Sequence, residues 1–449
     1  MAFSLHPMQR QNIAVIGSGI AGMSAAWLLS QRHQVTLYEK ADRIGGHSNT
    51  VTVPTSLGAT PVDTGFIVYN DVTYPNLVAL FDHLGVPTKR SDMSFGVSLN
   101  GGRTEYSSVG ASAFLCGGRN LISPRFWSMT FDLLRFYKNA PLELPRTRND
   151  LISLGEYLES RAYGEAFKRD HLLPQAAAIW SASMAEIHHY PACAFVRFFE
   201  NHGLLKLKGR PQWSTVDGGS RAYVSMLTAH YAHRARLNCG AVSVRRDTSG
   251  AWVRDAQGEA SHYDNIVIAT HADEALAMLD DPTPQERALL GAFRYAKNRA
   301  VLHTDEALMP RRKPLWASWN YVGDNPEGGC IVSYWMNKLQ RINSREQLFL
   351  TLNPRTMPRD ESILYETSYD HPLFDAAAIR AQEQIWSLQG VNKTWFCGAH
   401  FGAGFHEDGL QAGLAVAEQL GGVRRPWNVA EESGRIHLTA PAFRDAIAA

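Results

Sequence analysis

At 449 residues the chain is longer than a single hydrophobic core usually serves, so two domains are expected. Hydrophobic residues make up 45% of the chain and charged residues 19%, which is typical of a globular protein and excludes a disordered one. The formal net charge is +1, and the lysines and arginines are scattered along the chain. No overall field attracts nucleic acid, so we expect no nucleic-acid partner.

The five cysteines lie far apart and form no CxxC pair. This spacing argues against a disulfide framework and a structural zinc site, and it fits a reducing cytoplasm. The adjacent pair His188 and His189 has no further ligands nearby, so we expect no metal. No apolar run reaches the roughly 18–20 residues of a spanning helix. The sequence predicts a cytoplasmic protein, with peripheral contact to the inner face of the membrane as the alternative.

The first structural signal is a short apolar strand at 13–16 that runs into a glycine-rich turn, GSGIAG, at 17–22. A helix is expected at 23–31, then a second strand at 35–38 that ends in Glu39. In such a unit the first glycine permits the tight turn, the second lets the backbone approach a pyrophosphate, and the third allows the helix to pack on the strand. The start of the helix offers free N–H groups and partial positive charge to the phosphates.

Glu39 stands at the position of the acid that binds ribose hydroxyls in dinucleotide-binding units. An acid there disfavours a 2′-phosphate, so NADP is not expected at this site. Only one complete fingerprint of this kind is present, and the sequence therefore predicts no built-in NAD(P)H reductase site. These features predict an α/β fold with a Rossmann-like nucleotide-binding domain.

A second pair of glycines follows the acidic strand, within EKADRIGGH at 39–47. This arrangement resembles the FAD-dependent family that includes amine oxidases and phytoene desaturases, and it implies FAD instead of NAD. His47 stands where that family usually carries arginine. From this part of the chain the resemblance implies cofactor contacts by Gly17, Ser18, Gly19, Ile20, Ala21, Gly22, Glu39, Lys40, Gly45, Gly46 and His47.

A second glycine-rich segment lies near the other end of the chain. A strand is expected at 394–397, followed by GAHFGAGFHEDG at 398–409 and a helix that ends at Gly421 and Gly422. In the family that this chain resembles, such a turn lies beside the isoalloxazine, where the start of the helix stabilises negative charge on the reduced flavin. The resemblance implies cofactor contacts here by Gly398, Asp408, Gly409 and Leu410.

Between these segments, turns at 246–250 and 255–258 separate three expected strands, at 241–244, 252–253 and 262–269, which form a β-meander. By resemblance, the backbone of Val242 contacts the adenine. The other residues assigned to FAD by resemblance are Thr64, Gly65, Phe66, Ala269 and Thr270.

The cofactor domain is therefore expected to be discontinuous. We assign residues 10–70, 214–300 and 388–425 to FAD binding, which gives a flavoprotein with two dinucleotide-binding domains and a β-meander. Residues 71–213 and 301–387 form a mixed α+β substrate domain, and 426–449 form a C-terminal tail.

Two amphipathic segments stand out in the substrate part. Residues 73–85 predict a core-packed helix with Leu77, Leu80 and Phe81 on one face. Residues 111–140 alternate aromatic residues with four basic ones. This pattern is typical of a helix that lies in a membrane interface, and equally of a buried helix with cations that extend to solvent.

Strings at 62–70, 178–181, 201–205 and 334–340 are similar to one branch of this superfamily. The branch is a bacterial group of NAD/FAD-binding proteins, similar to the flavin-binding N-terminal region of plant cyclopropane fatty acid synthases. The similarity covers about residues 10–425. It implies oxidation, desaturation or other modification of a lipid acyl chain, with a methyltransferase-type synthase as partner.

Candidate catalytic residues follow from the two glycine-rich segments and from the strand that approaches the ring in relatives: His400, His406, Glu407, Tyr69 and Asn70. The amine-oxidising relatives often place a lysine near flavin N5, and no equivalent is evident here. Cys397 is not expected to attach the flavin covalently.

Three functions remain open. The first is an FAD-dependent oxidoreductase of oxidase, dehydrogenase or desaturase type that takes a hydride from a lipid acyl chain onto N5. The second is a flavin amine oxidase acting on a soluble amine. The third is an FAD-binding accessory protein of a lipid-modifying enzyme, with the tail as a docking arm.

Overall fold

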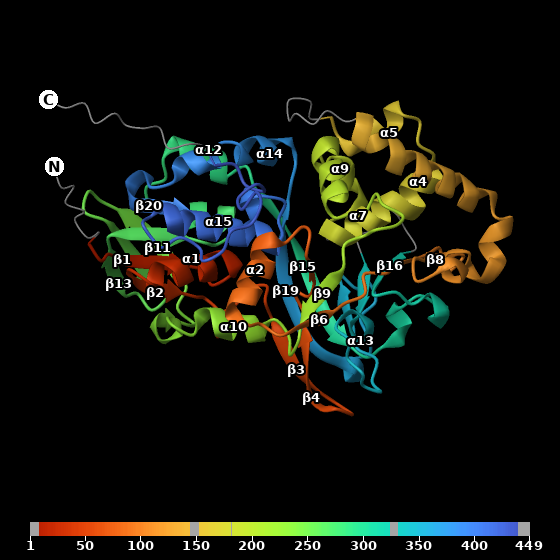
Figure 1. Ribbon diagram of the computed structural model, residues 1–449, viewed down its shortest axis with the longest axis horizontal. Helices are drawn as coiled ribbons and strands as arrows, with labels where there is room; N and C mark the ends of the chain where they lie inside the picture. The colour runs from red at the N-terminus through yellow and green to blue at the C-terminus, as the bar shows by residue number, and fades with distance from the viewer. Residues whose placement is uncertain (1–8, 144–151, 181, 324–330, 439–449) are drawn as a thin grey trace.

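The computed structural model describes residues 9–143, 152–180, 182–323 and 331–438. It forms an elongated molecule with a nucleotide-binding half at one end and a mixed sheet and helical region at the other (Figure 1). The expected Rossmann-like fold with a second, mixed α+β part is confirmed.

The nucleotide-binding half is built on a five-stranded parallel sheet in the order β10-β2-β1-β14-β20. Its central strands are buried, apolar runs, as a parallel sheet covered on both faces requires. The strands are β1 (Asn12–Ile16), β2 (Gln34–Tyr38), β10 (Ala235–Arg236), β14 (Asn265–Ile268) and β20 (Thr394–Phe396).

Two helices from opposite ends of the chain lie side by side on this sheet: α1 (Ile20–Ser30) and α15 (His406–Gln419). Helix α1 begins at Ile20, three residues earlier than the sequence suggested, because the glycine-rich turn itself forms the first helical turn. The meander is present as an antiparallel sheet of β11 (Ala241–Arg246), β12 (Ala251–Asp255) and β13 (Ala260–Tyr263). The last expected strand of the meander divides in two, and its apolar part, β14, joins the parallel sheet.

The other half contains a seven-stranded sheet in the order β19-β15-β18-β17-β16-β7-β8. Its long strands β15 (Arg294–His303) and β19 (Ile363–Leu373) run along the boundary with the nucleotide-binding half (Figure 1). The expected domain boundary at residue 300 therefore falls inside β15. The remaining strands are β18 (Phe349–Leu352), β17 (Val332–Trp335), β16 (Trp319–Gly323), β7 (Phe95–Leu99) and β8 (Thr104–Ser107).

Smaller sheets connect the halves. They contain β3 (Thr50–Thr55), β4 (Gly58–Asp63), β5 (Tyr69–Asn70), β6 (Thr88–Arg90) and β9 (Trp213–Val216). Helix α2 (Pro75–Leu84) ends at Gly85 in the left-handed conformation, as its sequence predicts. Although α2 was assigned to the substrate part, it packs on α15 and on α10 (Arg221–Thr228).

The helices of the far end are α4 (Pro124–Glu143), α5 (Leu154–Ser160), α7 (Leu173–Trp180) and α9 (Ala192–Asn201). Over the described residues, no helix is both long and apolar enough to cross a bilayer.

The described part of the tail, residues 426–438, lies against the nucleotide-binding half. The Trp427 ring stacks on Trp27 of α1 at 5.9 Å between centroids. Arg435 donates to the Thr73 carbonyl and forms an ion pair with Asp408. These contacts fix this part of the expected docking arm to its own chain, while residues 439–449 lie outside the described residues.

Candidate functional site

The turn between β1 and α1 is shaped for close approach of backbone and ligand. Gly17 has a φ of +97°, and a Cβ on it would lie 2.9 Å from the Ala269 carbonyl oxygen. A Cβ on Gly22 would lie 1.9 Å from the Gly17 oxygen, so no larger residue fits there. Around Gly19, in contrast, a Cβ would meet nothing within 4 Å, and no side chain caps the start of α1. The open space faces free helix N–H groups, as a bound pyrophosphate requires.

Glu39 lies beside this turn, at the end of β2. One of its carboxylate oxygens accepts hydrogen bonds from the Ser18 backbone and hydroxyl, and the other accepts from the Ala41 N–H at 2.8 Å. The acid is thus held where the nucleotide unit needs a ribose partner. Lys40 points to solvent and pairs with Glu274 at 2.6 Å, so its side chain is engaged on the surface.

The second glycine pair lies directly over the start of α1. A Cβ on Gly46 would lie 2.9 Å from the Gly19 Cα, which excludes other residues at that position. The Arg43 guanidinium donates to the Gly46 carbonyl at 2.8 Å and to the Ser48 carbonyl at 3.2 Å. Arg43 therefore fixes this loop and places a cation beside it.

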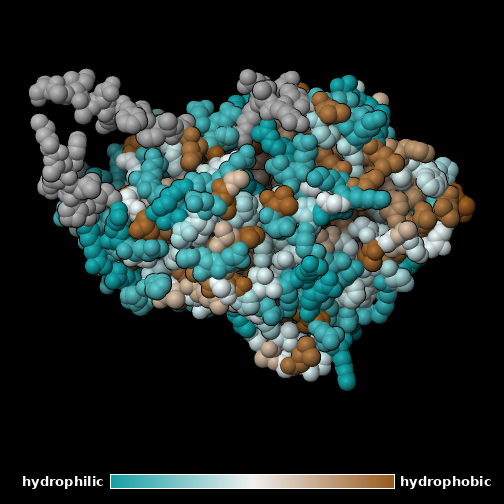
Figure 2. Space-filling model, in the orientation of Figure 1, coloured by the Kyte–Doolittle hydropathy of each residue, from teal (hydrophilic) through white to brown (hydrophobic). Residues whose placement is uncertain are grey.

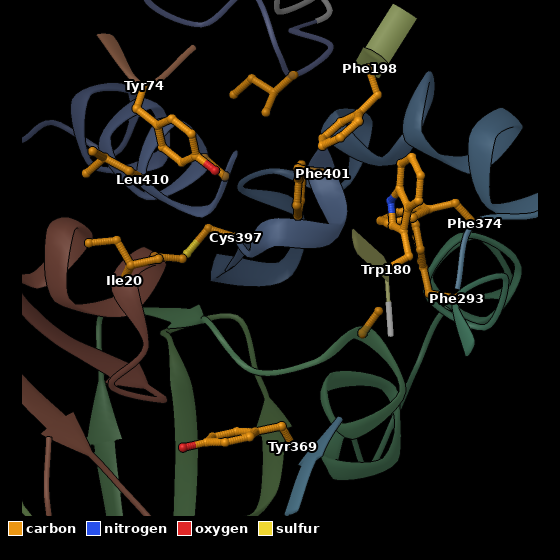
Figure 3. Packing of buried hydrophobic residues seen from close by; sticks show 14 of the residues in the cluster. Ile20, Tyr74, Trp180, Phe198, Phe293, Tyr369, Phe374, Cys397, Phe401 and Leu410 are labelled. Carbon is orange, nitrogen blue, oxygen red and sulfur yellow. The ribbon is translucent and has the colours of Figure 1, made fainter. Parts of the chain in front are cut away.

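The two glycine-rich segments meet in space. A Cβ on Gly409 would lie 2.9 Å from the Ile20 Cγ2, and one on Gly413 would lie 2.2 Å from the Ala21 carbonyl oxygen. Asp408 accepts a hydrogen bond from the Phe405 N–H at 2.7 Å and caps the first turn of α15. The convergence expected from the sequence is therefore present, and Figure 3 shows Ile20 and Leu410 on the same side of the core.

Three histidines, His47, His271 and His371, lie close together beside this convergence. The His47 ring lies 5.6 Å from His371 and 6.2 Å from His271. Burial, with smaller effects from the neighbouring histidines, lowers the pKa of His47 well below its usual value. Burial likewise lowers the pKa of His371 to about 4, and its Nδ1 lies 3.1 Å from the Asn298 amide nitrogen. His47 is therefore neutral at pH 7, and the nearby cation is Arg43.

His406, the first residue of α15, lies among residues assigned to the cofactor. Its ring stacks on Phe66 at 3.8 Å between centroids, and its Nε2 lies 2.6 Å from the Tyr223 hydroxyl. Burial lowers the pKa of His406 to about 3, so the imidazole is neutral. Thr64, two residues before Phe66, is hydrogen-bonded to the Tyr369 hydroxyl at 2.7 Å.

His400 lies in the short turn η9 (Ala399–Phe401), which precedes α15. It is buried against Phe293, and its Nε2 has no hydrogen-bond partner among the described residues. Its ring occupies the space that a Cβ on Gly398 would need. Burial lowers the pKa of His400 to about 3 and raises that of the Cys397 thiol, which disfavours Cys397 as a nucleophile.

The other three candidate catalytic residues lie together around the start of α2. Glu407 accepts hydrogen bonds from the backbone of Asn76 and Leu77, so its carboxylate caps that helix. Asn70 caps the preceding turn through its Oδ1, while its Nδ2 is buried without a partner in the described structure. The Tyr69 ring packs on α2. Two of the five candidates thus contact residues assigned to the cofactor: His406 stacks on Phe66, and the His400 ring lies against Gly398.

An aromatic cluster leads away from the start of α15. Phe405 stacks on Phe198 of α9 at 4.8 Å, and Phe198 lies 4.7 Å from Trp180 of α7 and 3.8 Å from His202. Trp180, Phe198 and Phe374 lie opposite Ile20 and Leu410 in Figure 3. Burial lowers the pKa of His202 to about 3, so this cluster is uncharged.

Val242 lies at an irregularity in β11 and its side chain is exposed, so its contact with the adenine stays a prediction. Ala269 and Thr270 follow β14 and border the Gly17 turn.

Sequence reasoning missed the contribution of β15 and β19. Asn298, Tyr369 and His371 share one face of these strands, and Tyr369 and His371 contact the loop of His47 and Asn49. The period-two spacing of Tyr365, Tyr369 and His371 is the signal that could have identified this face. His271 was missed too, although it lies three residues after β14, directly behind the assigned cofactor residues Ala269 and Thr270.

Comparison with known proteins agrees with this geometry. A model of the flavin containing amine oxidoreductase family matches residues 20–337. A Mycobacterium tuberculosis protein named as a flavin-containing monoamine oxidase is 26% identical over 327 residues, which is 71% of this chain and 68% of the relative.

Two solved structures share the fold at low sequence identity. Cyclohexylamine oxidase from Brevibacterium oxydans has a TM-score of 0.67 at 16% identity, with 92% of this chain and all of that chain covered. A fatty acid isomerase from P. acnes has a TM-score of 0.65 at 15% identity, with 91% and 98% covered.

The family match covers more than half of the chain, and the open space at Gly19, the free start of α1 and the placement of Glu39 fit an FAD nucleotide. The chain belongs to the flavin containing amine oxidoreductase family and is an FAD-dependent oxidoreductase.

Proposed function

We propose that this FAD-dependent oxidoreductase takes a hydride from an apolar substrate of the lipid acyl type. Bound FAD supplies a ring that accepts the hydride at N5. The observation that carries the proposal is the uncharged aromatic cluster, Phe405, Phe198, Trp180 and His202, which begins at the start of α15 and leads into α7 and α9.

Apolar side chains of this kind favour an apolar ligand. Each methylene group of an acyl chain that leaves water gains about 0.8 kcal/mol. An ammonium group entering the same surroundings loses its hydration and needs an anionic partner or a favourable aromatic face. The charge state of the neighbouring side chains therefore separates the two substrate classes.

The two acids that follow Phe405 at the start of α15 are already engaged. Glu407 receives hydrogen bonds from Asn76, Leu77 and Gln411, which together use both carboxylate oxygens. Asp408 is paired with Arg435 and caps its own helix. Neither carboxylate is free to pair with an ammonium substrate, which supports the apolar class.

The lysine of amine-oxidising relatives has no counterpart on the face formed by β15 and β19. Lys297 lies on β15, but its side chain is exposed and its neighbour Asn298 is the residue buried on the side of His371. Among the buried polar residues of the described structure there is no lysine.

Loss of a hydride from one carbon and a proton from the next would give a double bond. His47, His371 and His406 are neutral, so each imidazole has a lone pair for that proton, although the burial that lowers their pKa also makes them weak bases. His406 is the candidate we favour, because it contacts Phe66 and is oriented by the Tyr223 hydroxyl. Oxygen or another external acceptor would then reoxidise the cofactor.

The proposal is tested by mixing the purified yellow protein with lipids or amines in the absence of oxygen. We expect phospholipid or fatty acid to bleach the flavin absorbance and amines to leave it unchanged. Phe198→Ala should slow bleaching by lipid about tenfold or more, because it removes one aromatic wall of the proposed acyl-chain site, and a tenfold change corresponds to about 1.4 kcal/mol. Phe136→Ala, equally buried but packed in α4, is the matched control and should bleach at the wild-type rate.

A soluble amine is the second candidate, favoured by the name of the Mycobacterium tuberculosis relative. Bleaching by an amine, with hydrogen peroxide released in air, would establish it and refute the lipid proposal. A yellow protein that neither class reduces would point to the third function, an accessory protein whose partner is a methyltransferase-type enzyme.

A further inference from the structure

Helix α4 is apolar on two opposite faces. Its inner face packs into the core through Phe126, Met129, Leu133, Phe136 and Ala140. Its outer face presents Trp127, Phe131 and Leu134, which the described structure leaves exposed. A surface helix normally carries polar residues on its outer face, so this one departs from the pattern.

The exposed residues form one continuous strip. Trp127, Phe131 and Leu134 are spaced by four and three residues, which places them on the same side of the helix. Ile122 and Leu142, at the two ends, are 88% and 79% exposed, and Phe131 is 68% exposed. We call this strip the outer α4 face, and it consists of Leu121, Ile122, Trp127, Phe131, Leu134 and Leu142.

Figure 2 shows apolar residues gathered at the end of the molecule where α4 lies, far from the nucleotide-binding half. Single exposed apolar residues are common on soluble proteins, but a clustered set marks an interaction surface. The Trp127 indole donates to the Leu121 carbonyl at 2.9 Å and its ring lies 6.4 Å from Phe131. The strip is therefore ordered before any partner binds.

The charge around the strip is positive. Residues 109–142 contain four cations, Arg119, Arg125, Arg135 and Lys138, and a single acid, Asp132. Arg125 is paired with the buried Asp170 of a neighbouring segment. Asp132 is neutralised by Arg135 and accepts a hydrogen bond from the Gly164 N–H. Within the described structure Lys138 is exposed and has no ion-pair partner. Basic residues beside an apolar, aromatic helix face are the pattern that attracts anionic lipid headgroups.

We propose that the outer α4 face docks the protein onto the surface of a bilayer that contains anionic phospholipid. The apolar residues enter the boundary between headgroups and acyl chains, and the cations lie at the phosphates. A second copy of the chain fits this face poorly, because a twofold interface would bring the same cations against each other.

This proposal stands apart from the choice of substrate, because it concerns where the protein binds and not what it oxidises. Docking through the outer α4 face would also bring the aromatic cluster near the acyl chains of the bilayer. Helix α4 packs on α9, the helix that carries Phe198 of the aromatic cluster.

Co-sedimentation with vesicles tests the proposal on the FAD-loaded full chain. We expect binding to phosphatidylcholine vesicles that contain about one-third phosphatidylglycerol, and weaker binding when the salt is raised or phosphatidylglycerol is left out. The double variant Phe131→Glu and Leu134→Glu should lower the partition coefficient at least about tenfold. Arg119→Gln with Lys138→Gln should lower it less, and only for anionic vesicles.

The matched control places the same charges on exposed apolar residues elsewhere, Leu207→Glu with Val391→Glu, and should bind as wild type does. Flavin absorbance and melting temperature confirm that every variant is folded. Wild-type protein that stays in the supernatant with anionic vesicles would overturn the proposal, as would equal binding by the Phe131 and Leu134 variant. A wild-type dimer that this variant converts to monomer would assign the face to self-association instead.

Discussion

The nucleotide-binding end and the far end of the molecule differ in the kind of contact that packs each of them internally. At the nucleotide end, glycines let backbone touch backbone, as where α15 approaches α1 at Gly413 and where Gly46 lies over Gly19. At the far end, aromatic side chains pack on each other, as Trp180 does on Phe198. Only glycine fits where two backbones touch, whereas a packed side chain can be replaced by another of similar size. The cofactor end is thus fixed, and the far end is adaptable to a substrate.

The largest effect is expected from a methyl group placed in a backbone contact. Gly22→Ala puts a Cβ 1.9 Å from the Gly17 oxygen, so the turn and helix must separate. We expect the free energy of unfolding to fall by at least about 3 kcal/mol, with loss of FAD. Urea unfolding measures the change, and Gly110→Ala, where a Cβ meets nothing, should be neutral. Equal stability of the two variants would contradict the comparison.

Gly19 separates binding from folding at the same turn. Because a Cβ there meets no protein atom, Gly19→Val should leave the melting temperature of the FAD-free protein within a few degrees of wild type. The side chain would fill the space predicted for the pyrophosphate, so FAD occupancy should fall at least about tenfold. Glu39→Ala should lower occupancy less, through the ribose. Visible absorbance per protein measures occupancy, and full occupancy in both variants would refute the cofactor placement.

Lowering the pH should reduce the free energy of unfolding, because buried histidines lie in both ends of the molecule. Burial lowers the pKa of His171, His202, His400 and His406 to about 3, against about 6.5 in an unfolded chain. The unfolded state binds the protons, so the stabilisation is complete above pH 6.5 and is lost as the pH falls toward 3. Between these two pKa values, each such histidine lowers the free energy of unfolding by about 1.4 kcal/mol for every unit of pH decrease.

Urea unfolding at pH 7.5, 6.5 and 5.5 measures this slope. His202→Gln should reduce the proton uptake on unfolding by about one near pH 5, whereas the exposed His230→Gln should leave the slope unchanged. A free energy of unfolding that is constant over this range would show that these histidines are protonated in the folded protein.

The smallest effect is expected at Lys297. Its side chain is exposed, so Lys297→Met should change the rate of anaerobic flavin bleaching less than about twofold. Asn298→Ala, on the buried side of the same strand, removes the hydrogen bonds to His371 and Asn353 and should have the larger effect. A large loss of rate in the Lys297 variant alone would favour the amine oxidase function.

The nucleotide end was largely predictable because its chemistry is local in sequence. A strand, a glycine turn, a helix and an acid occur within 13–39, and each has one structural role. Residues 394–409 likewise contain a strand, a glycine-rich turn and the start of a helix within a short stretch. The family resemblance then joined the two segments, and the glycine contacts between α1 and α15 agree with it.

The far side of the site was less predictable because it depends on contacts between distant segments. Glu407 looked catalytic from its position, yet its carboxylate caps α2, more than 300 residues earlier in the chain. The aromatic cluster joins helices α7 and α9 to Phe405, and no local sequence pattern predicts this contact. For 111–140, α4 buries one apolar face, as a core helix does, and exposes a second one, while contact with a membrane stays a prediction.

The strand order of the parallel sheet has a consequence for how the protein is made. Strand β1 lies between β2 and β14, and the edge strand β20 comes from residues 394–396. A chain emerging from the ribosome therefore presents the first nucleotide-binding unit long before its neighbours in the sheet are synthesised. The partner of Asp408, Arg435, emerges later still. The nucleotide site, which needs contacts between segments from both ends of the chain, is therefore complete only late in synthesis.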